Sequence, residues 1–214
     1  MSANKIYTAI GSRGTGKTPF ITGGDLLPGL EETYKYFNPG LAGLYLRKGM
    51  STLVIDEIDH VRYREKFPLL HPDSYRKTLT AKPGFYRTLS PVHFMEPLKQ
   101  RMAVEKLVWN TLIVWEDYHK HIHNPLTDME SILVGNSKQQ NIDMFFATWD
   151  WGFLYPDLAR FTNYYVVFPS ASSPENRKQY LKGCYDKVCT AWEKVMLSSR
   201  TDKKIPYLIV DSGI

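Results

Sequence analysis

The sequence predicts an α/β fold, with a mainly parallel sheet flanked by helices. Two observations lead to this class. Six short apolar segments with the composition of β-strands alternate with helical segments along the 214 residues, which is the order that parallel sheets with crossover helices produce. Apolar residues make up 43% of the chain and charged residues 23%, a globular composition with enough apolar surface for a buried core.

The length is sufficient for one substantial domain and too short for two ordinary ones. We therefore expect a single domain over residues 1–214, with a basic insertion at about 60–106 and a C-terminal helix and strand at about 173–211. The sequence has no 18-residue apolar run and no signal-peptide core, so we expect a soluble protein without a membrane span. Cys184 and Cys189 lie five positions apart in a predicted helix, on different faces, and we interpret both as packing residues.

The first strand, at 5–10, runs directly into a loop that matches the Walker A spacing G-x-x-x-x-G-K-[ST] at every position. Pro19 follows in the first helical turn, where the N–H that it lacks would have no partner. In such a loop, backbone N–H groups wrap the phosphates, Lys17 neutralises their charge and the Thr18 hydroxyl binds Mg²⁺. We therefore expect ATP and Mg²⁺ as cofactors, with the nucleotide bound by Gly11, Ser12, Arg13, Gly14, Thr15, Gly16, Lys17 and Thr18.

Two later strands end in paired carboxylates, Asp56-Glu57 and Glu116-Asp117. Four apolar residues before an Asp-Glu pair are the literal form of the Walker B strand, and the first of the two strands fits this form better. Only one of them can serve the magnesium ion. The residues alone leave this choice open.

A basic segment lies between the two acid-ended strands, with ten Lys and Arg against four Asp and Glu in residues 61–110. Closely spaced prolines exclude long helices over most of it, so we expect an irregular excursion. Five aromatic residues are interleaved with the charges: Tyr63, Phe67, Tyr75, Phe85 and Tyr86. This composition favours contact with DNA phosphates over a merely solvated face. The candidate DNA-binding residues are Arg62, Arg64, Lys66, Arg76, Lys77, Lys82 and Arg87.

The second half of the chain supplies further strands and a long helix. Strands are expected at 142–148, 164–168 and 207–211. From Ser173 onward, apolar residues recur at three- and four-residue intervals and predict one amphipathic helix with Tyr180, Leu181, Cys184, Val188, Trp192 and Val195 on its buried face. The histidines at 119, 121 and 123 lack further zinc ligands and are interpreted as a polar loop.

The order of these motifs resembles the FtsK/HerA superfamily of P-loop ATPases, and most of all the genome-packaging ATPases of internal-membrane, double jelly-roll, double-stranded DNA viruses. The resemblance covers roughly residues 5–170. It implies a P-loop NTPase fold of the RecA-like, ASCE type and an ATPase that drives double-stranded DNA into a preformed capsid. It also implies a homo-oligomeric ring of five or six copies, contact with capsid vertex proteins, and a place in the host cytoplasm or the virion.

In that superfamily the Walker B strand comes late in the chain, so the resemblance favours Glu116 and Asp117 as catalytic residues beside Lys17, with Glu116 also serving Mg²⁺. Their order is reversed from the usual Asp-Glu. The trans-acting cation that reaches a neighbour's nucleotide would be Lys138 or Arg160. A γ-phosphate-sensing glutamine is usual where this sequence has Trp149, so the sensing role stays open.

Two alternative functions remain at this point. One is a Zot-like phage morphogenesis or export ATPase, although such proteins usually carry a membrane span. The other is a small P-loop kinase that acts on a metabolite, in which the basic segment would be the lid over the substrate.

Overall fold

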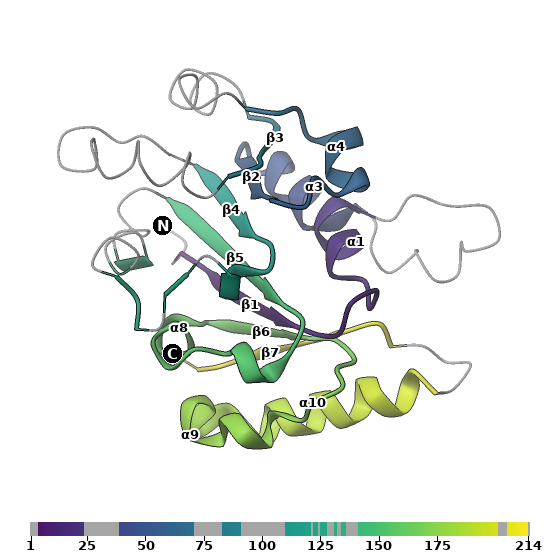
Figure 1. The fold of residues 1–214 in the computed structure, drawn as a ribbon, viewed down its shortest axis with the longest axis vertical. Helices are drawn as coiled ribbons and strands as arrows, with labels where there is room; N and C mark the ends of the chain where they lie inside the picture. The colour runs from purple at the N-terminus through teal and green to yellow at the C-terminus, as the bar shows by residue number, and fades with distance from the viewer. Residues whose placement is uncertain are drawn as a thin grey trace.

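The computed structural model describes residues 4–23, 39–70, 83–90, 110–120, 122–123, 125–127, 131, 134–135, 141–200 and 205–213. These residues form one seven-stranded sheet in the order β3-β2-β4-β5-β1-β6-β7 (Figure 1). Its strands are β1 (Ile6–Ile10), β2 (Ser51–Ile55), β3 (Phe85–Thr88), β4 (Thr111–Trp115), β5 (Ile142–Thr148), β6 (Tyr164–Val167) and β7 (Leu208–Asp211). Neighbouring strands pair in parallel except β7, which is antiparallel to β6. The predicted α/β class with a mainly parallel sheet is confirmed.

The basic segment is less irregular than its sequence predicts. Its described part contains α4 (Val61–Lys66) and the edge strand β3, which pairs with β2. The sequence analysis missed β3 because this short strand lies among prolines and has a charged residue, Arg87, at a position that turns out to be buried. Two of the five interleaved aromatic residues, Tyr63 and Phe67, are also in the core.

The sheet order brings the predicted functional segments to one edge. β5 lies between β1 and β4, and β2 lies beyond β4. Because the carboxyl ends of parallel strands meet at the same edge, the residues after β1, β2, β4 and β5 lie side by side there. The glycine-rich loop, both carboxylate pairs and Trp149 follow these four strands.

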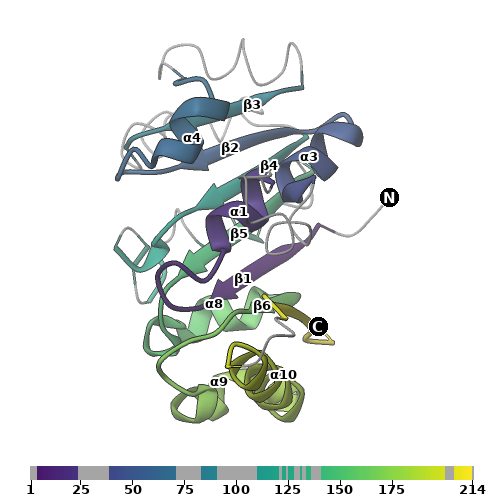
Figure 2. The same ribbon diagram turned by 90° about the vertical axis from the view of Figure 1, so that its right-hand side faces the viewer.

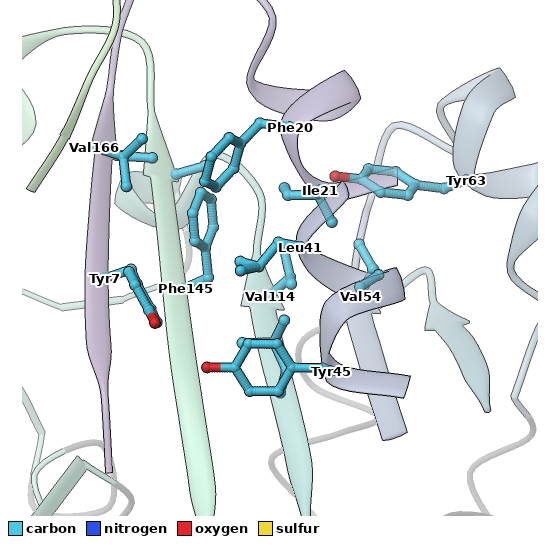
Figure 3. Packing of buried hydrophobic residues seen from close by; sticks show 14 of the residues in the cluster. Tyr7, Phe20, Ile21, Leu41, Tyr45, Val54, Tyr63, Val114, Phe145 and Val166 are labelled. Carbon is cyan, nitrogen blue, oxygen red and sulfur yellow. The ribbon is translucent and has the colours of Figure 1, made fainter. Parts of the chain in front are cut away.

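One face of the sheet is covered by α1 (Lys17–Thr22), α3 (Gly40–Arg47) and α4, which bury an aromatic-rich cluster against it (Figure 3). α1 and α3 lie side by side (Figure 2). Their close approach depends on Gly40, which has a φ of +76°, and where a Cβ would come within 2.1 Å of the Gly23 nitrogen. A side chain at Gly40 would therefore push α3 away from α1.

The other face carries α8 (Pro156–Phe161), α9 (Lys178–Leu181) and α10 (Tyr185–Ser198), with α10 packed along β6 and β7. The single long helix predicted after Ser173 is wrong. Two short 3₁₀ turns, Pro174–Arg177 and Lys182–Cys184, interrupt it. Lys182 has a positive φ of 42°, which no helix interior accepts, so the chain changes direction before α10.

Four of the predicted apolar positions of this segment are nevertheless buried: Leu181, Cys184, Val188 and Val195. The periodicity therefore identified the correct face, although it did not reveal the break. In the described part of the chain, the helices are all too short or too polar to span a bilayer.

Candidate active site

The glycine-rich loop links β1 to α1, and its first two residues are hydrogen-bonded to the chain at the ends of the two strands beside β1. The Gly11 N–H donates to the Thr148 carbonyl oxygen at 3.2 Å, and the next N–H donates to the Pro169 carbonyl oxygen at 2.9 Å. Gly14 and Gly16 have φ values of +76° and +107°, a region that residues with a Cβ rarely adopt. The loop is thereby fixed between the ends of β5 and β6, with its backbone curled as phosphate binding requires.

Lys17 is 9% exposed and its ammonium group bends back onto the loop. It donates to the carbonyl oxygens of Gly11 and Ser12, the latter at 3.0 Å. Burial lowers the pKa of Lys17, while the carboxylates of Glu116 and Asp117 act in the opposite direction. The cation is therefore held where the loop and the acids that follow β4 meet.

A cleft of about 760 Å³ opens above the loop. This volume is within the range of sites that bind small molecules. Both acid-ended strands contribute to it, through Asp56 and through Glu116 with Asp117. The remaining lining includes Arg13, Thr18, His60, Arg62, Tyr63, Trp149, Pro169, Ser199, Ile205 and Pro206.

The carboxyl group of Glu116 lies deep in the cleft, and this burial raises its pKa to about 7. A hydrogen bond from the Tyr63 hydroxyl and the charge of Lys17 act in the opposite direction, while Asp117 and Asp56 add to the increase. A carboxylate with a pKa near 7 has the balance between ionisation and basicity that a general base needs. Glu116 therefore has the properties of a proton acceptor at this site.

The other three acids differ from Glu116. The Asp117 carboxylate forms an ion pair with Lys120 at 2.8 Å. The Asp56 carboxylate accepts the N–H of His60 at 2.7 Å, directly before α4, so it supports the start of that helix. Glu57 is exposed and lies outside the cleft lining. Glu116, after β4, therefore feels the charge of Lys17, whereas Asp56, after β2, is bonded to the start of α4.

His119 and Trp149 form a network that the sequence analysis missed. The Trp149 indole N–H donates to His119 Nε2 at 3.0 Å, and His119 Nδ1 lies 3.1 Å from the Thr148 hydroxyl. Since an indole nitrogen can only donate, Nε2 accepts, and the neutral ring carries its proton on Nδ1. The Arg13 guanidinium lies 5.9 Å from the centre of the Trp149 ring. The position of the expected sensor is therefore connected both to the phosphate loop and to the end of β4.

The polar-loop interpretation is therefore wrong for His119, whose ring also stacks on Phe153 with centroids 4.2 Å apart. The sequence signal that could have pointed to His119 as part of the site is its position three residues after Glu116. Among the described residues, no group of three or more His, Cys, Asp or Glu is arranged to hold a metal ion by itself.

The two candidate trans-acting cations are Arg160 and Lys138. Arg160 is on α8, has a side chain that is 68% exposed, and lies 3.5 Å from Asp157. It does not line the cleft. Lys138 lies outside the described residues.

The candidate DNA-binding residues other than Arg87 fall into three groups. Arg64 is exposed and Lys66 partly exposed on α4, as surface contact with DNA requires. Arg62 lines the cleft, which places it beside the loop rather than on an outer surface. Arg76, Lys77 and Lys82 lie outside the described residues.

The prediction that Arg87 contacts DNA is wrong. Its side chain is buried, with Nε donating to the Phe67 carbonyl oxygen at 3.0 Å and Nη1 lying 2.5 Å from Asp59 Oδ1. This arginine fastens β3 to the end of α4 and to the turn after β2. It is part of the core and not of a surface that could meet a polyanion.

Replacing Arg87 by methionine should lower the free energy of unfolding by about 1–3 kcal/mol, because the buried carbonyl oxygen of Phe67 loses its donor. Arg64→Met is a matched control, since Arg64 reaches the same Asp59 at 3.5 Å from an exposed position and should cost less than about 1 kcal/mol. Urea unfolding of both variants measures the difference. Equal losses would contradict the structural role of Arg87.

The Walker A loop at the carboxyl end of β1, in a mainly parallel sheet with the acid-ended β4 beside the same cleft, defines a P-loop ATPase fold. No protein-family model and no curated protein sequence matches the chain.

Solved structures share this fold over nearly the whole chain. The genome packaging NTPase B204 from Sulfolobus turreted icosahedral virus 2, in complex with AMP, matches with a TM-score of 0.67 and 15% identity over 100% of this chain and 95% of that one. Its complex with ATP-gammaS gives a TM-score of 0.66 and 12% identity over 99% and 94%. B204 from Sulfolobus Turreted Icosahedral Virus, a DNA-packaging ATPase, gives 0.61 and 13% over 100% and 95%. The resemblance inferred from the motifs is confirmed at the level of the fold.

Proposed function

We propose that the protein is an ATPase that drives double-stranded DNA into a preformed viral capsid. The observation that carries this proposal is the cleft, where the Walker A loop, Lys17 and Glu116 come together. The fold around the cleft extends over 95% of the chain of a viral genome packaging NTPase. These two facts support ATP hydrolysis as the energy source and genome packaging as its use.

In this proposal the loop N–H groups bind the phosphates of ATP, and Lys17 neutralises their charge. Oxygen ligands of the kind that Mg²⁺ prefers line the cleft, in the Thr18 hydroxyl and the Glu116 carboxyl group. Bound Mg²⁺ would balance the negative charge of the β- and γ-phosphates. Glu116 orients the attacking water and accepts its proton, while Asp117, held by Lys120, supports the same end of β4.

The exposed side of α4 is the proposed start of the DNA-binding surface. Arg64 and Lys66 project from this helix, whose neighbouring residues Arg62 and Tyr63 line the nucleotide cleft. Contact with DNA phosphates at α4 would therefore occur one helical turn from the site of hydrolysis. Arg76, Lys77 and Lys82 remain candidates for contact with DNA phosphates from their sequence alone.

The protein is proposed to act as a ring of five or six copies, at a capsid vertex, in the host cytoplasm or the virion. A ring places one copy's exposed cation beside the next copy's nucleotide, where it can stabilise charge in the transition state. Arg160, with its exposed side chain, and Lys138 are the candidates for this role.

The proposal predicts that long double-stranded DNA stimulates ATP hydrolysis severalfold, and that stimulation falls steeply between about 50 mM and about 200 mM salt because contacts to phosphates release counterions. Phosphate release is measured with and without DNA at both salt concentrations. Arg64→Ala combined with Lys66→Ala should reduce stimulation and leave the DNA-free rate unchanged.

Lys187→Ala combined with Lys194→Ala is the matched control, because it removes two exposed charges from α10. No stimulation by DNA, together with phosphate transfer to a nucleoside or a sugar, would replace the packaging proposal by a metabolite kinase. If both double variants lost the stimulation by DNA equally, α4 would not be the specific DNA-binding surface.

A further inference from the structure

Tyr63 reaches from α4 into the nucleotide site. Its side chain is fully buried, and its ring packs edge-to-face against Phe67 at 5.5 Å and against His60 at 6.0 Å. The hydroxyl points towards α1 (Figure 3) and donates to Oε1 of Glu116. The ring is therefore held by packing, and only its hydroxyl takes part in the site.

Burial raises the pKa of the Tyr63 hydroxyl, and the neighbouring Thr18 side chain acts in the opposite direction. Thr18 and Tyr63 both line the cleft. Tyr63 thus lies between the last residue of the Walker A loop and the acid that follows β4, although it belongs to neither motif.

Glu116 depends on the hydrogen bond from Tyr63 for its direction. Within the described part of the chain, Tyr63 is the one side chain recorded as a hydrogen-bond donor to Glu116. The backbone N–H of Glu116 is bonded to the Ile55 carbonyl oxygen at 3.2 Å, which fixes the main chain, whereas the Tyr63 hydroxyl bonds to the carboxyl group itself. A general base must point at the water that it deprotonates, so the donor that fixes its rotamer affects the rate.

We infer that Tyr63 is a positioning residue for the hydrolysis proposed above, because its hydroxyl holds the Glu116 carboxylate in line with Thr18 and the phosphate loop. The inference rests on the proposed ATPase activity and adds α4 to the elements that build the site. Tyr63 does not touch the phosphates in this arrangement and acts through Glu116.

Tyr63→Phe tests the inference, since it keeps the ring and its packing and removes only the hydroxyl. We expect kcat to fall about 10- to 100-fold, as for the loss of a group that orients a ligand or base. KM for ATP should change less than about threefold, because the loop N–H groups are untouched. The Mg²⁺ concentration for half-maximal activity should rise, because Glu116, a proposed Mg²⁺ ligand, loses the donor that holds its carboxyl group.

Tyr45→Phe is the matched control. Tyr45, on α3, is also buried and also donates to a carboxylate (Figure 3). Its acceptor is Asp143, which lies at the start of β5 and therefore at the edge of the sheet opposite the cleft. Its loss should lower the melting temperature and leave kcat and the Mg²⁺ dependence unchanged. An equal fall in kcat for both variants would mean that Tyr63 matters only for stability.

A double-mutant cycle with Glu116→Gln shows whether Tyr63 affects kcat through Glu116 or independently of it. In the Glu116→Gln background, Tyr63→Phe should change kcat less than about twofold, because the group that it positions is already disabled. The same loss in both backgrounds, or no loss in the single variant, would overturn the inference. The rates are measured without DNA, so an enzyme that hydrolyses ATP but ignores DNA would overturn the packaging proposal and leave the result for Tyr63 standing.

Discussion

Lys17→Ala should reduce ATP hydrolysis at least about 100-fold, because it removes the cation that neutralises charge on the transferred phosphoryl group. The ammonium group is largely buried and held by two carbonyl oxygens of its own loop, which places its charge at the loop itself. Nucleotide affinity, measured by calorimetry with a non-hydrolysable ATP analogue, should fall as well. Phosphate release gives the rate.

Lys48→Ala is the control for loss of a lysine, since Lys48 lies at the end of α3 with its ammonium group 5.0 Å from the centre of the Tyr45 ring. It should keep the wild-type rate. An unchanged rate in Lys17→Ala would mean that the loop does not bind the reacting phosphates. The site would then have to be sought elsewhere in the chain.

Glu116→Gln should lower kcat about 10²- to 10⁴-fold while nucleotide binding is retained, because glutamine keeps the shape and can still accept the Tyr63 hydrogen bond but cannot accept a proton. Asp56→Asn should instead keep kcat within about threefold of the wild-type value, because Asp56 serves the start of α4 and the amide oxygen of asparagine can still accept the N–H of His60. Its stability should change by less than about 1 kcal/mol, since asparagine and aspartate cap a helix about equally well.

Comparing these two variants by single-turnover hydrolysis and by urea unfolding decides between the two acid-ended strands. A large kcat loss in Asp56→Asn with little effect in Glu116→Gln would assign catalysis to β2. That result would also remove the basis for the positioning role of Tyr63.

The fold class was predictable because its signals are local. Strand-forming segments alternate along the chain, and the Walker A spacing identifies the turn from β1 to α1. β5 was predicted with the bounds that the structure gives, Ile142–Thr148, since its central run Met144–Ala147 is apolar and follows a long polar loop. The break at Lys182 was not predictable in this way, because it depends on how α10 packs against β6 and β7.

The site was predictable only where residue type alone defines the chemistry. The loop belongs to that class, whereas the preference for the acids after β4 over Asp56-Glu57 came from the family resemblance, because both pairs follow an apolar strand. Arg87 was counted with the surface charges because its partners, Asp59 and the Phe67 carbonyl group, become neighbours only after folding. Tyr63 was taken for an aromatic residue in a DNA-binding segment for the same reason, since nothing in its sequence context points to Glu116.

The position of β1 in the middle of the sheet has a consequence for the order in which the chain can fold during synthesis. β1 is the first strand to leave the ribosome, yet both strands that pair with it, β5 and β6, come much later, and Lys5 bonds to Asp143 across 138 residues. Contacts of such long range form slowly. β1 therefore cannot form its native pairs until β5 and β6 have been translated, so the glycine-rich loop is made well before the sheet that holds it in place.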